Sequence, residues 1–596
     1  MGFRLDESDH PQSKTLHLPS LRLLVMNEWF KQVGPGLFAA VAGVVAVLPA
    51  IILGVPNNND LANHYHFAIP FYEALRQGEI YPGWLATPNF GFGDVVVRFY
   101  PPALYYLLAA GRALVGNWYV ATLLVIAALS ALGSLGAYFW ARCFVPRKIA
   151  VWAGVFYAFM PYHLSEFYQA AQLAEFAGGA ALLFAFAFAC RLGNEGRWRD
   201  VAGLAAAYAA LILSHLPLAV FGSLALLVYA LINLRKRTPG VSFLRLSAGV
   251  LGGLAASSFY WARMVPELKW IIADGANPDP LLDYRHNFVF STFSAEKQET
   301  LWWMALLAIA TLMMCAPAFV ILRKRFESAS RRGLIAVATL LIFSIFMSTA
   351  LSKPVWAVVP YLRLTQHPFR WLAVTSAVAP ILMAASVPFW SKQIQQRQRS
   401  VALMMTGLVL IAVTFSLSQT VRGATYLSRP TFERMLAPLK ESPSIVQWLP
   451  IWASASANNK PSYEKCLPPA LTAKKIDAPN RQLSVIEWSD LKRVFEVEAG
   501  PAAEARVATF YYPHWVAEAN GHTLSIRPAN DGTLLIALPP QKVVVNLEFR
   551  EPLRTKLAAT ISIISWTLVG SLLIFGSFSR KRRDHEPIRR DATHQS

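Results

Sequence analysis

Uncharged apolar runs of about 20 residues recur along the chain, and they restrict its fold more than any other feature. The first of them is GLFAAVAGVVAVLPAIILGV at 36–55. Because hydrocarbon offers a backbone no hydrogen-bonding partner, each run must be a helix, and about 20 residues cross a core of about 30 Å. Hydrophobic residues make up 55% of the sequence and charged residues 15%, which is too apolar for a soluble protein. The sequence therefore predicts an all-α polytopic membrane protein.

We expect about 12 transmembrane helices in this chain. Their predicted ranges are 36–56, 118–141, 149–163, 173–190, 200–214, 217–233, 244–264, 301–322, 333–351, 371–389, 400–420 and 554–577. The apolar segment 100–116 is expected to lie on the outer surface as an interfacial helix, because a span there would place Arg142 and Lys148 outside. The first 35 residues lack the pattern of a removable signal peptide, so the first span should be retained.

The chain has a net charge of +20, and its basic residues cluster at positions where they would orient a membrane protein. We therefore expect no nucleic-acid partner. Basic clusters stand between two spans or after the last one, within 142–148, 191–199, 235–237, 323–332 and 392–399, and in the tail SRKRRDHEPIRR. The positive-inside rule places such clusters, and with them both termini, in the cytoplasm. Residues 1–35 and 578–596 are then a cytoplasmic N-terminal segment and a basic cytoplasmic tail.

Residues 421–553 have a different pattern from the rest of the chain. Stretches such as RVFEVEAG, TLLIALPP and VVVNLEF alternate as strands do, and NG at 520–521 and DG at 531–532 favour hairpin turns. We therefore expect a C-terminal extracytoplasmic β-rich domain between the membrane domain at 36–420 and the last helix at 554–577.

The first outer loop, predicted at 57–117, opens with NNNDLANHYH directly after the first apolar run. Polar residues also stand at other outer ends of predicted spans: His163, Glu166, Gln169, Glu175, His215, Glu267, Arg363, His367 and Arg370. Solvation or a helix cap explains each of them alone. Together they are what a polar cavity at the outer membrane surface would need.

Several short motifs in this chain resemble those of a known family. Asp60 and His64 are followed by LRQGEIYPGW, NFGFGD, FYPP, LSHLPLAVFG, SSFYWARMVPELKW, QHPFRWL, YYPHWVAEANG and LLIALPPQKVVVNLEF. Their order is similar to that in the bacterial membrane family labelled 6-pyruvoyl-tetrahydropterin synthase-related, itself similar to YfhO-like proteins, within the GT-C glycosyltransferase superfamily. The chain departs from the pattern at His367, where relatives often carry an aromatic or apolar residue.

The resemblance implies a GT-C-like fold and a membrane enzyme. Such enzymes take a sugar from a polyprenyl-phosphate carrier on the outer side of the bacterial inner membrane, where nucleotide sugars are absent. We expect a multi-pass glycosyltransferase of that membrane, with the bilayer, a polyprenyl-phosphate-sugar lipid and an unknown envelope glycan, lipid or protein acceptor as partners. The pterin label does not imply a zinc site, because His64 and His66 point to opposite sides of a helix.

An acceptor hydroxyl loses a proton as it attacks the sugar, which requires a carboxylate within hydrogen-bond reach. Asp60 is the expected base, because the family places its acid in this loop. Asp94 and Glu166 are the next candidates, either as a partner acid or as ligands for a divalent cation. His64 and His215 are expected to orient the acid or the sugar. Asp60 and Asp94 are also expected ligands if a divalent cation takes part, since such cations take oxygen ligands.

The leaving group is a lipid phosphate, which a planar guanidinium holds through two hydrogen bonds. Arg370, where the chain re-enters the membrane in QHPFRW, is expected to hold it, with Arg363 and Arg98 as weaker candidates. The expected substrate-binding residues are Arg98, His215, Glu267, Arg363, His367 and Arg370.

Two other functions stay open on the sequence alone. One is a transporter or flippase that does not use ATP, since the sequence has no credible phosphate-binding loop. Two features argue against a transporter: the polar residues lie at the outer ends of the spans, and no internal repeat is evident. The other is a non-catalytic scaffold for envelope polysaccharide assembly, in which the acid has no role.

Overall fold

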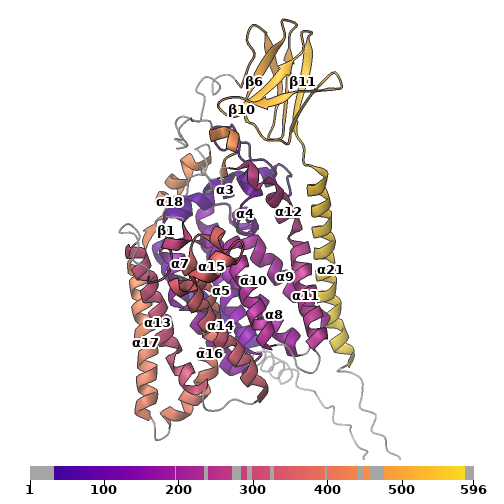
Figure 1. Cartoon of the computed structure of the whole chain (residues 1–596). Coiled ribbons are helices and arrows are strands. Elements are labelled where there is room, and N and C mark those ends of the chain that lie inside the picture. The colour runs from indigo at the N-terminus through magenta and orange to yellow at the C-terminus, as the bar shows by residue number, and fades with distance from the viewer. Residues whose placement is uncertain are drawn as a thin grey trace, which may run out of the picture.

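The computed structural model shows a helical bundle with a β-rich domain at one end (Figure 1). It describes residues 33–194, 196–233, 239–271, 283–290, 298–322, 328–395, 399–440, 448–454 and 475–583. The predicted cytoplasmic segments 1–35 and 578–596 lie largely outside these residues.

Within the described residues, eight helices are long and apolar enough to cross a membrane. They are α5 (Trp118–Ala141), α8 (Leu173–Asn194), α10 (Leu216–Asn233), α13 (Gln298–Leu322), α14 (Ser328–Ser348), α16 (Trp371–Ile394), α17 (Arg399–Arg422) and α21 (Leu553–Arg583). α8 and α16 are the most enclosed of the eight, with 83% of each apolar window buried. The predicted polytopic helical architecture is confirmed.

The other four predicted spans are short or broken, so the predicted count of about 12 is not reproduced. The first is an apolar helix at Val33–Ala46 followed by α2 (Leu48–Leu53), with Pro49 at the junction. The second divides at Pro161 into α6 (Arg147–Ala158) and α7 (Pro161–Tyr168).

α9 (Trp198–Ser214) has 17 residues, because the chain turns at once into α10 through His215. The fourth span is a pair, α11 (Pro239–Ala256) and α12 (Ser258–Glu267), bent by 70°. Proline and serine interruptions do not register in a hydropathy average, so the sequence did not reveal these breaks.

Three shorter helices gather near the end of the bundle that carries the β-rich domain (Figure 1). They are α3 (Asn59–Arg76), α4 (Ala103–Val115) and α18 (Arg429–Leu436). α4 has 13 residues, too few to span a bilayer, and packs against α3 and α5. Remaining short elements are η1 (Val96–Arg98), η2 (Leu268–Trp270), η3 (Tyr284–His286), η5 (Ala350–Ser352), α15 (Lys353–Val358), η6 (Leu362–Thr365), η7 (Pro368–Arg370), η8 (Ala437–Lys440) and η10 (Ile451–Ser454).

The β-rich domain contains two antiparallel sheets, with strand orders β3-β6-β10-β9 and β4-β5-β11-β7-β8. Its strands are β3 (Ile476–Asp477), β4 (Leu483–Trp488), β5 (Lys492–Val497), β6 (Ala503–Phe510), β7 (Trp515–Ala519), β8 (His522–Leu524), β9 (Ile526–Pro528), β10 (Thr533–Leu538) and β11 (Val543–Phe549). The predicted turn at Asn520 and Gly521 joins β7 to β8 with φ angles of 51° and 77°, as a tight hairpin requires. The expected β-rich domain before the last helix is confirmed.

A separate two-stranded sheet links distant parts of the chain. β1 (Val55–Asn57), directly before α3, pairs with β2 (Thr425–Leu427), directly after α17. Gly54 has a φ of 123°, and a Cβ there would collide with the Leu427 carbonyl. This pairing fixes the start of α3.

The orientation in the membrane is tested by thiol labelling. In a variant whose native cysteines are replaced by serine, Thr523→Cys in β8 should react with an impermeant maleimide in intact cells. Ser400→Cys, at the start of α17 beside the basic cluster 392–399, should react only after permeabilisation. Both residues are exposed, so a reversed pattern would mean the opposite orientation.

Candidate functional site

Residues from five segments converge in the half of the bundle nearer the β-rich domain. We call this set the outer cluster: Asp60 and His64 on α3, His163 and Glu166 on α7, Glu175 on α8, His215 between α9 and α10, and Arg370 at the end of η7. Five of these seven residues were named as candidate site residues from the sequence: Asp60, His64, Glu166, His215 and Arg370.

Glu175 is the centre of the outer cluster. It lies in the first turn of α8 and is 1% exposed. Its Oε2 lies 3.2 Å from Arg370 Nε and 4.0 Å from His215 Nε2, and its Oε1 accepts a hydrogen bond of 3.1 Å from the Tyr162 hydroxyl. A buried carboxylate needs such partners, and its place at a helix N-terminus adds a favourable dipole.

The turn before α16 positions Arg370. Gln366 has a φ of 62°, which is uncommon for a residue with a side chain, and Pro368 starts η7. Asn287, fully buried, donates to the Gln366 carbonyl at 3.0 Å and accepts from the Phe369 amide at 3.3 Å. The strained turn is thus held from both sides, which fixes the guanidinium beside Glu175.

Asp60 is half-buried in the first turn of α3, immediately after β1. Burial raises the pKa of its carboxyl group, while the charge of Arg370 and a hydrogen bond from Asn63 act in the opposite direction. The side chain of Asp60 is therefore close enough to Arg370 for the two charges to interact, although the residues are far apart in the sequence.

His64 follows Asp60 by one helical turn and is 3% exposed. Burial lowers its pKa to about 4, against a hydrogen bond with the Ala171 backbone that acts to raise it. Its Nδ1 lies 3.5 Å from the Tyr105 hydroxyl. His64 is therefore neutral near pH 7 and serves as a hydrogen-bonding group, not as a cation.

Glu166 and His163 form the deep side of the outer cluster. Both are 4% exposed, and His163 Nδ1 lies 3.8 Å from Glu166 Oε2. The imidazole is stacked on Phe176 with ring centroids 4.5 Å apart. Burial and then the neighbouring charge of Glu175 raise the pKa of Glu166. In the described part of the chain, Glu166 Oε1 and His163 Nε2 are buried without a hydrogen-bond partner, which is uncommon for buried polar atoms.

Arg98 and Glu267 lie away from the outer cluster, in a joint between the membrane helices and the β-rich domain. Arg98 is fully buried and binds Glu267 through Nε and Nη2 at 2.6 and 2.9 Å. Its Nη1 binds Glu551 Oε1 at 2.5 Å. Glu267 also accepts hydrogen bonds from Tyr512, His514 and Arg554, at 2.6, 2.9 and 2.8 Å.

We call Arg98, Glu267, Glu551, Tyr512, His514 and Arg554 the domain joint. Burial acts to raise the pKa of Glu551, but the charges of Arg98 and Arg263 outweigh it and lower the pKa. Arg98 and Glu267, both expected to bind substrate, thus bind each other and residues of the β-rich domain and of the segment before α21.

Three other sequence candidates have individual positions. Asp94 is buried, and its Oδ1 accepts hydrogen bonds from the Val95 and Val96 amides at 2.6 and 3.0 Å, at the start of η1. Arg363 is exposed on η6, and His367 stacks on Phe369 at 5.1 Å. None of these contacts joins them to the outer cluster.

Glu175 and His163 of the outer cluster, and Tyr162, which donates to Glu175, had no predicted role in the sequence analysis. The sequence marked Glu175 and His163 as polar residues at outer ends, which was the available signal. Among the residues that the structure describes, no three histidine, cysteine or acidic side chains gather closely enough to hold a metal ion. Asp94, one of the two expected metal ligands, uses its Oδ1 for backbone amides.

Comparison with known proteins gives one family match. A family model described as 6-pyruvoyl-tetrahydropterin synthase related domain, membrane protein, matches residues 97–422. No curated protein matches the chain.

Several solved structures resemble the chain at a distance. Arabinofuranosyltransferase AftD from mycobacteria has 17% identity and a TM-score of 0.42 over 65% of this chain and 26% of its own, so the chain spans about a quarter of AftD. ArnT from Cupriavidus metallidurans, solved with undecaprenyl phosphate, has 17% identity and a TM-score of 0.37 over 68% of this chain and 76% of its own. The Archaeoglobus fulgidus oligosaccharyltransferase has 11% identity and a TM-score of 0.37, over 74% and 60%. TM-scores below 0.5 are too low to carry a conclusion about fold or reaction.

The domain joint is tested with Arg98→Met. This change leaves Glu267 buried without its main cation, which typically costs about 3–5 kcal/mol of folding free energy. Thermal unfolding in detergent should begin at a markedly lower temperature, and the β-rich domain should become sensitive to protease. Arg550→Met is the matched control, because its ion pair with Glu518 is exposed and contributes little. Equal melting temperatures for the two variants would contradict a structural role for Arg98.

Proposed function

Because this chain belongs to the 6-pyruvoyl-tetrahydropterin synthase related family of membrane proteins, and its polar residues gather in one cluster, we propose that it is a membrane glycosyltransferase. The proposed reaction moves a sugar from a polyprenyl-phosphate donor to an envelope acceptor on the side of the membrane that carries the β-rich domain. One observation carries the proposal. The Asp60 carboxylate lies close enough to Arg370 for the positive charge of the arginine to act on its pKa.

Asp60 is the proposed general base. A base must be ionised when it accepts the proton of the acceptor hydroxyl, and it works best when its pKa is closer to the working pH than that of a free carboxyl group. Burial raises the pKa of Asp60, which moves it in this direction. The residue is half-buried, so an acceptor can approach it.

Arg370 is the proposed ligand of the donor phosphate. Its Nε faces Glu175, which leaves the two Nη nitrogens as the remaining donors on the planar group. The ion pair orients the guanidinium before the donor arrives, and a preorganised cation stabilises negative charge that develops on the leaving phosphate. His215, near the same carboxylate, supports this orientation.

Glu166 and His163 are proposed to bind hydroxyl groups of the sugar. Both present a buried polar atom without a partner in the described residues. Buried polar atoms of this kind are costly unless a ligand or water satisfies them, so a hydroxylated ligand fits the site better than an apolar one.

A transporter or flippase is the second candidate, and one observation favours it. Glu175 lies within a membrane-length helix, and ionisable groups at such positions often belong to ion or substrate pathways. Lipid-linked sugar and glycan profiling of cells that lack the protein separates these functions. Loss of a glycan modification with accumulated donor supports transfer, whereas donor trapped in the opposite leaflet supports flipping.

The role of Asp60 is tested with Asp60→Asn. The amide keeps the shape and hydrogen bonding but cannot take a proton, so turnover on a polyprenyl-phosphate-sugar donor should fall by about 10²–10⁴-fold. Donor binding and thermal stability should change little. Asp477→Asn, the same chemical change at an exposed residue of β3, is the control. Wild-type turnover by Asp60→Asn would exclude the base and leave the residue as a helix cap.

The role of Arg370 is tested with two substitutions. Arg370→Lys keeps the charge but loses the two-pronged contact, so turnover should fall by an amount equivalent to about 1.5–3 kcal/mol. Full activity of this variant would contradict phosphate binding through the guanidinium.

Arg370→Gln tests the electrostatic link to Asp60. The positive charge lowers the pKa of Asp60, so removing the charge should raise that pKa further. A base loses activity as the pH falls through its pKa. The acid limb of kcat/KM should therefore move to higher pH in Arg370→Gln, and stay near the wild-type position in Arg370→Lys. An unmoved limb in Arg370→Gln would mean that the two groups do not interact.

A further inference from the structure

One tyrosine hydroxyl beside the outer cluster has no hydrogen-bond partner among the described residues. It belongs to Tyr100, which lies in the first outer loop shortly after η1 and is half-buried. The hydroxyls of Tyr81, Tyr105 and Tyr106, the other tyrosines in this part of the loop, each have a partner, at 2.6, 3.5 and 2.6 Å. Tyr100 is therefore the exception among its neighbours.

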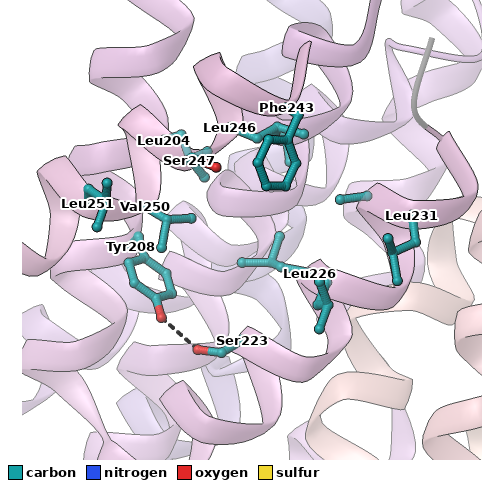
Figure 2. A pocket seen from close by; sticks show the side chains of 13 residues that line it. Leu204, Tyr208, Ser223, Leu226, Leu231, Phe243, Leu246, Ser247, Val250 and Leu251 are labelled. Atoms are coloured by element: carbon teal, nitrogen blue, oxygen red, sulfur yellow. Dashed lines mark hydrogen bonds between the residues drawn. The ribbon is translucent and has the colours of Figure 1, made fainter. Parts of the chain in front are cut away.

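A tyrosine elsewhere in the bundle shows the usual arrangement. A cavity of about 360 Å³ among α8, α9, α10 and α11 is lined mainly by apolar side chains, and Tyr208 is one of its few polar residues (Figure 2). Its hydroxyl is hydrogen-bonded to the Ser223 hydroxyl at 2.7 Å (Figure 2). Buried tyrosine hydroxyls normally find such a partner, because removing them from water without one is costly.

The aromatic ring of Tyr100 is fixed on several sides. Its centroid lies 5.3 Å from that of Phe67, 5.8 Å from that of Tyr105, and 6.2 Å from those of both His64 and Trp448. The contacts with His64 and Trp448 are edge-to-face, an arrangement that aromatic rings favour. The ring therefore packs directly against a member of the outer cluster.

The backbone of Tyr100 is held as firmly as its ring. Its amide donates to the Val96 carbonyl at 3.0 Å, and the preceding carbonyl, of Phe99, accepts a hydrogen bond of 2.8 Å from the Tyr260 hydroxyl. Pro101 follows directly, and a proline restricts the backbone of the residue before it. A side chain held in this way presents its hydroxyl in a fixed position, which a preorganised substrate contact requires.

The hydroxyl of Tyr100 lies among charged groups of the outer cluster. Burial raises its pKa, the carboxylates of Asp60 and Glu175 raise it further, and the guanidinium of Arg370 acts in the opposite direction. All three groups are therefore close enough to interact with the hydroxyl. Because the pKa is raised, the hydroxyl keeps its proton near neutral pH and can donate a hydrogen bond.

We propose that Tyr100 is a substrate-binding residue, and that its hydroxyl donates a hydrogen bond to an oxygen of the substrate bound at Asp60 and Arg370. This role rests on the proposed function, which places the acceptor at Asp60 and the donor phosphate at Arg370. Such a site needs neutral donors, because ionised carboxylates only accept hydrogen bonds and the Tyr162 hydroxyl already donates to Glu175. The oxygen belongs either to the phosphate or to the reacting sugar and acceptor.

The role of the hydroxyl is tested with Tyr100→Phe in the purified full-length protein. The change keeps the ring contacts, so the melting temperature should stay near that of the wild type. If the oxygen belongs to the phosphate, binding of undecaprenyl phosphate in detergent should weaken about tenfold or more, as expected for a lost hydrogen bond to a charged group. A markedly lower melting temperature would assign the hydroxyl a structural role and overturn the proposal.

Tyr72→Phe is the matched control. Tyr72 is also half-buried, and its hydroxyl has no partner in the described part of the chain. Its ring packs edge-to-face on Trp118 at 5.4 Å. It stands on α3 more than three helical turns beyond Asp60, roughly 18 Å away along the helix axis. Undecaprenyl phosphate binding by Tyr72→Phe should equal that of the wild type.

A second measurement detects a hydrogen bond to the sugar or the acceptor. Cells that lack the protein, and have lost a glycan for that reason, receive each variant at equal abundance in the membrane. Unchanged undecaprenyl phosphate binding with glycan restored about tenfold more slowly would place the hydrogen bond there. Wild-type behaviour of Tyr100→Phe in both measurements would overturn the proposal. A wild-type protein that does not bind undecaprenyl phosphate would instead contradict the proposed function, and the role of Tyr100 with it.

Discussion

The burial of Glu175 at the N-terminus of α8 determines how the outer end of the bundle is arranged. A carboxylate that is 1% exposed requires a cation and hydrogen-bond donors, and it finds them in Arg370, His215 and Tyr162. These partners come from three other segments of the chain. The ion pair therefore sets where α7, α16 and the α9–α10 turn meet, and Asp60 on α3 lies close enough to interact with Arg370.

A second buried acid, Glu267, does the same at the boundary between domains. Arg98, Tyr512, His514 and Arg554 converge on it from the first outer loop, from the strand region and from the start of α21. Glu175 and Glu267 resemble each other in the sequence, because both stand at the end of an apolar run: Glu175 at the start of one and Glu267 after another. Their partners differ, since those of Glu175 all belong to the membrane domain, whereas those of Glu267 join the membrane domain to the β-rich domain and α21.

Much of the architecture could be predicted from the sequence because hydrophobic runs of membrane length are unambiguous. The same pattern placed Asp60, His215 and Arg370 at outer ends of helices, which is why they came together. It could not show that Arg98 and Glu267, 169 residues apart, bind each other, because hydropathy gives the depth of a residue and not its neighbours. It also missed the breaks at Pro161 and at Ser257, where a short interruption divides an apolar run.

The pairing of β1 with β2 has a consequence for how the protein is made. Asn57 and its partner Thr425 are 368 residues apart, and Asp60 lies three residues beyond Asn57. At a synthesis rate of about 5–20 residues per second, the first strand waits roughly 20–70 seconds for the second to emerge. Throughout that interval the helix that carries Asp60 lacks its anchor. Of the eight membrane-length helices in the described residues, seven, from α5 to α17, precede β2. The anchor of Asp60 therefore forms only after these seven have been synthesised, so a nascent chain has no finished outer cluster to engage a substrate.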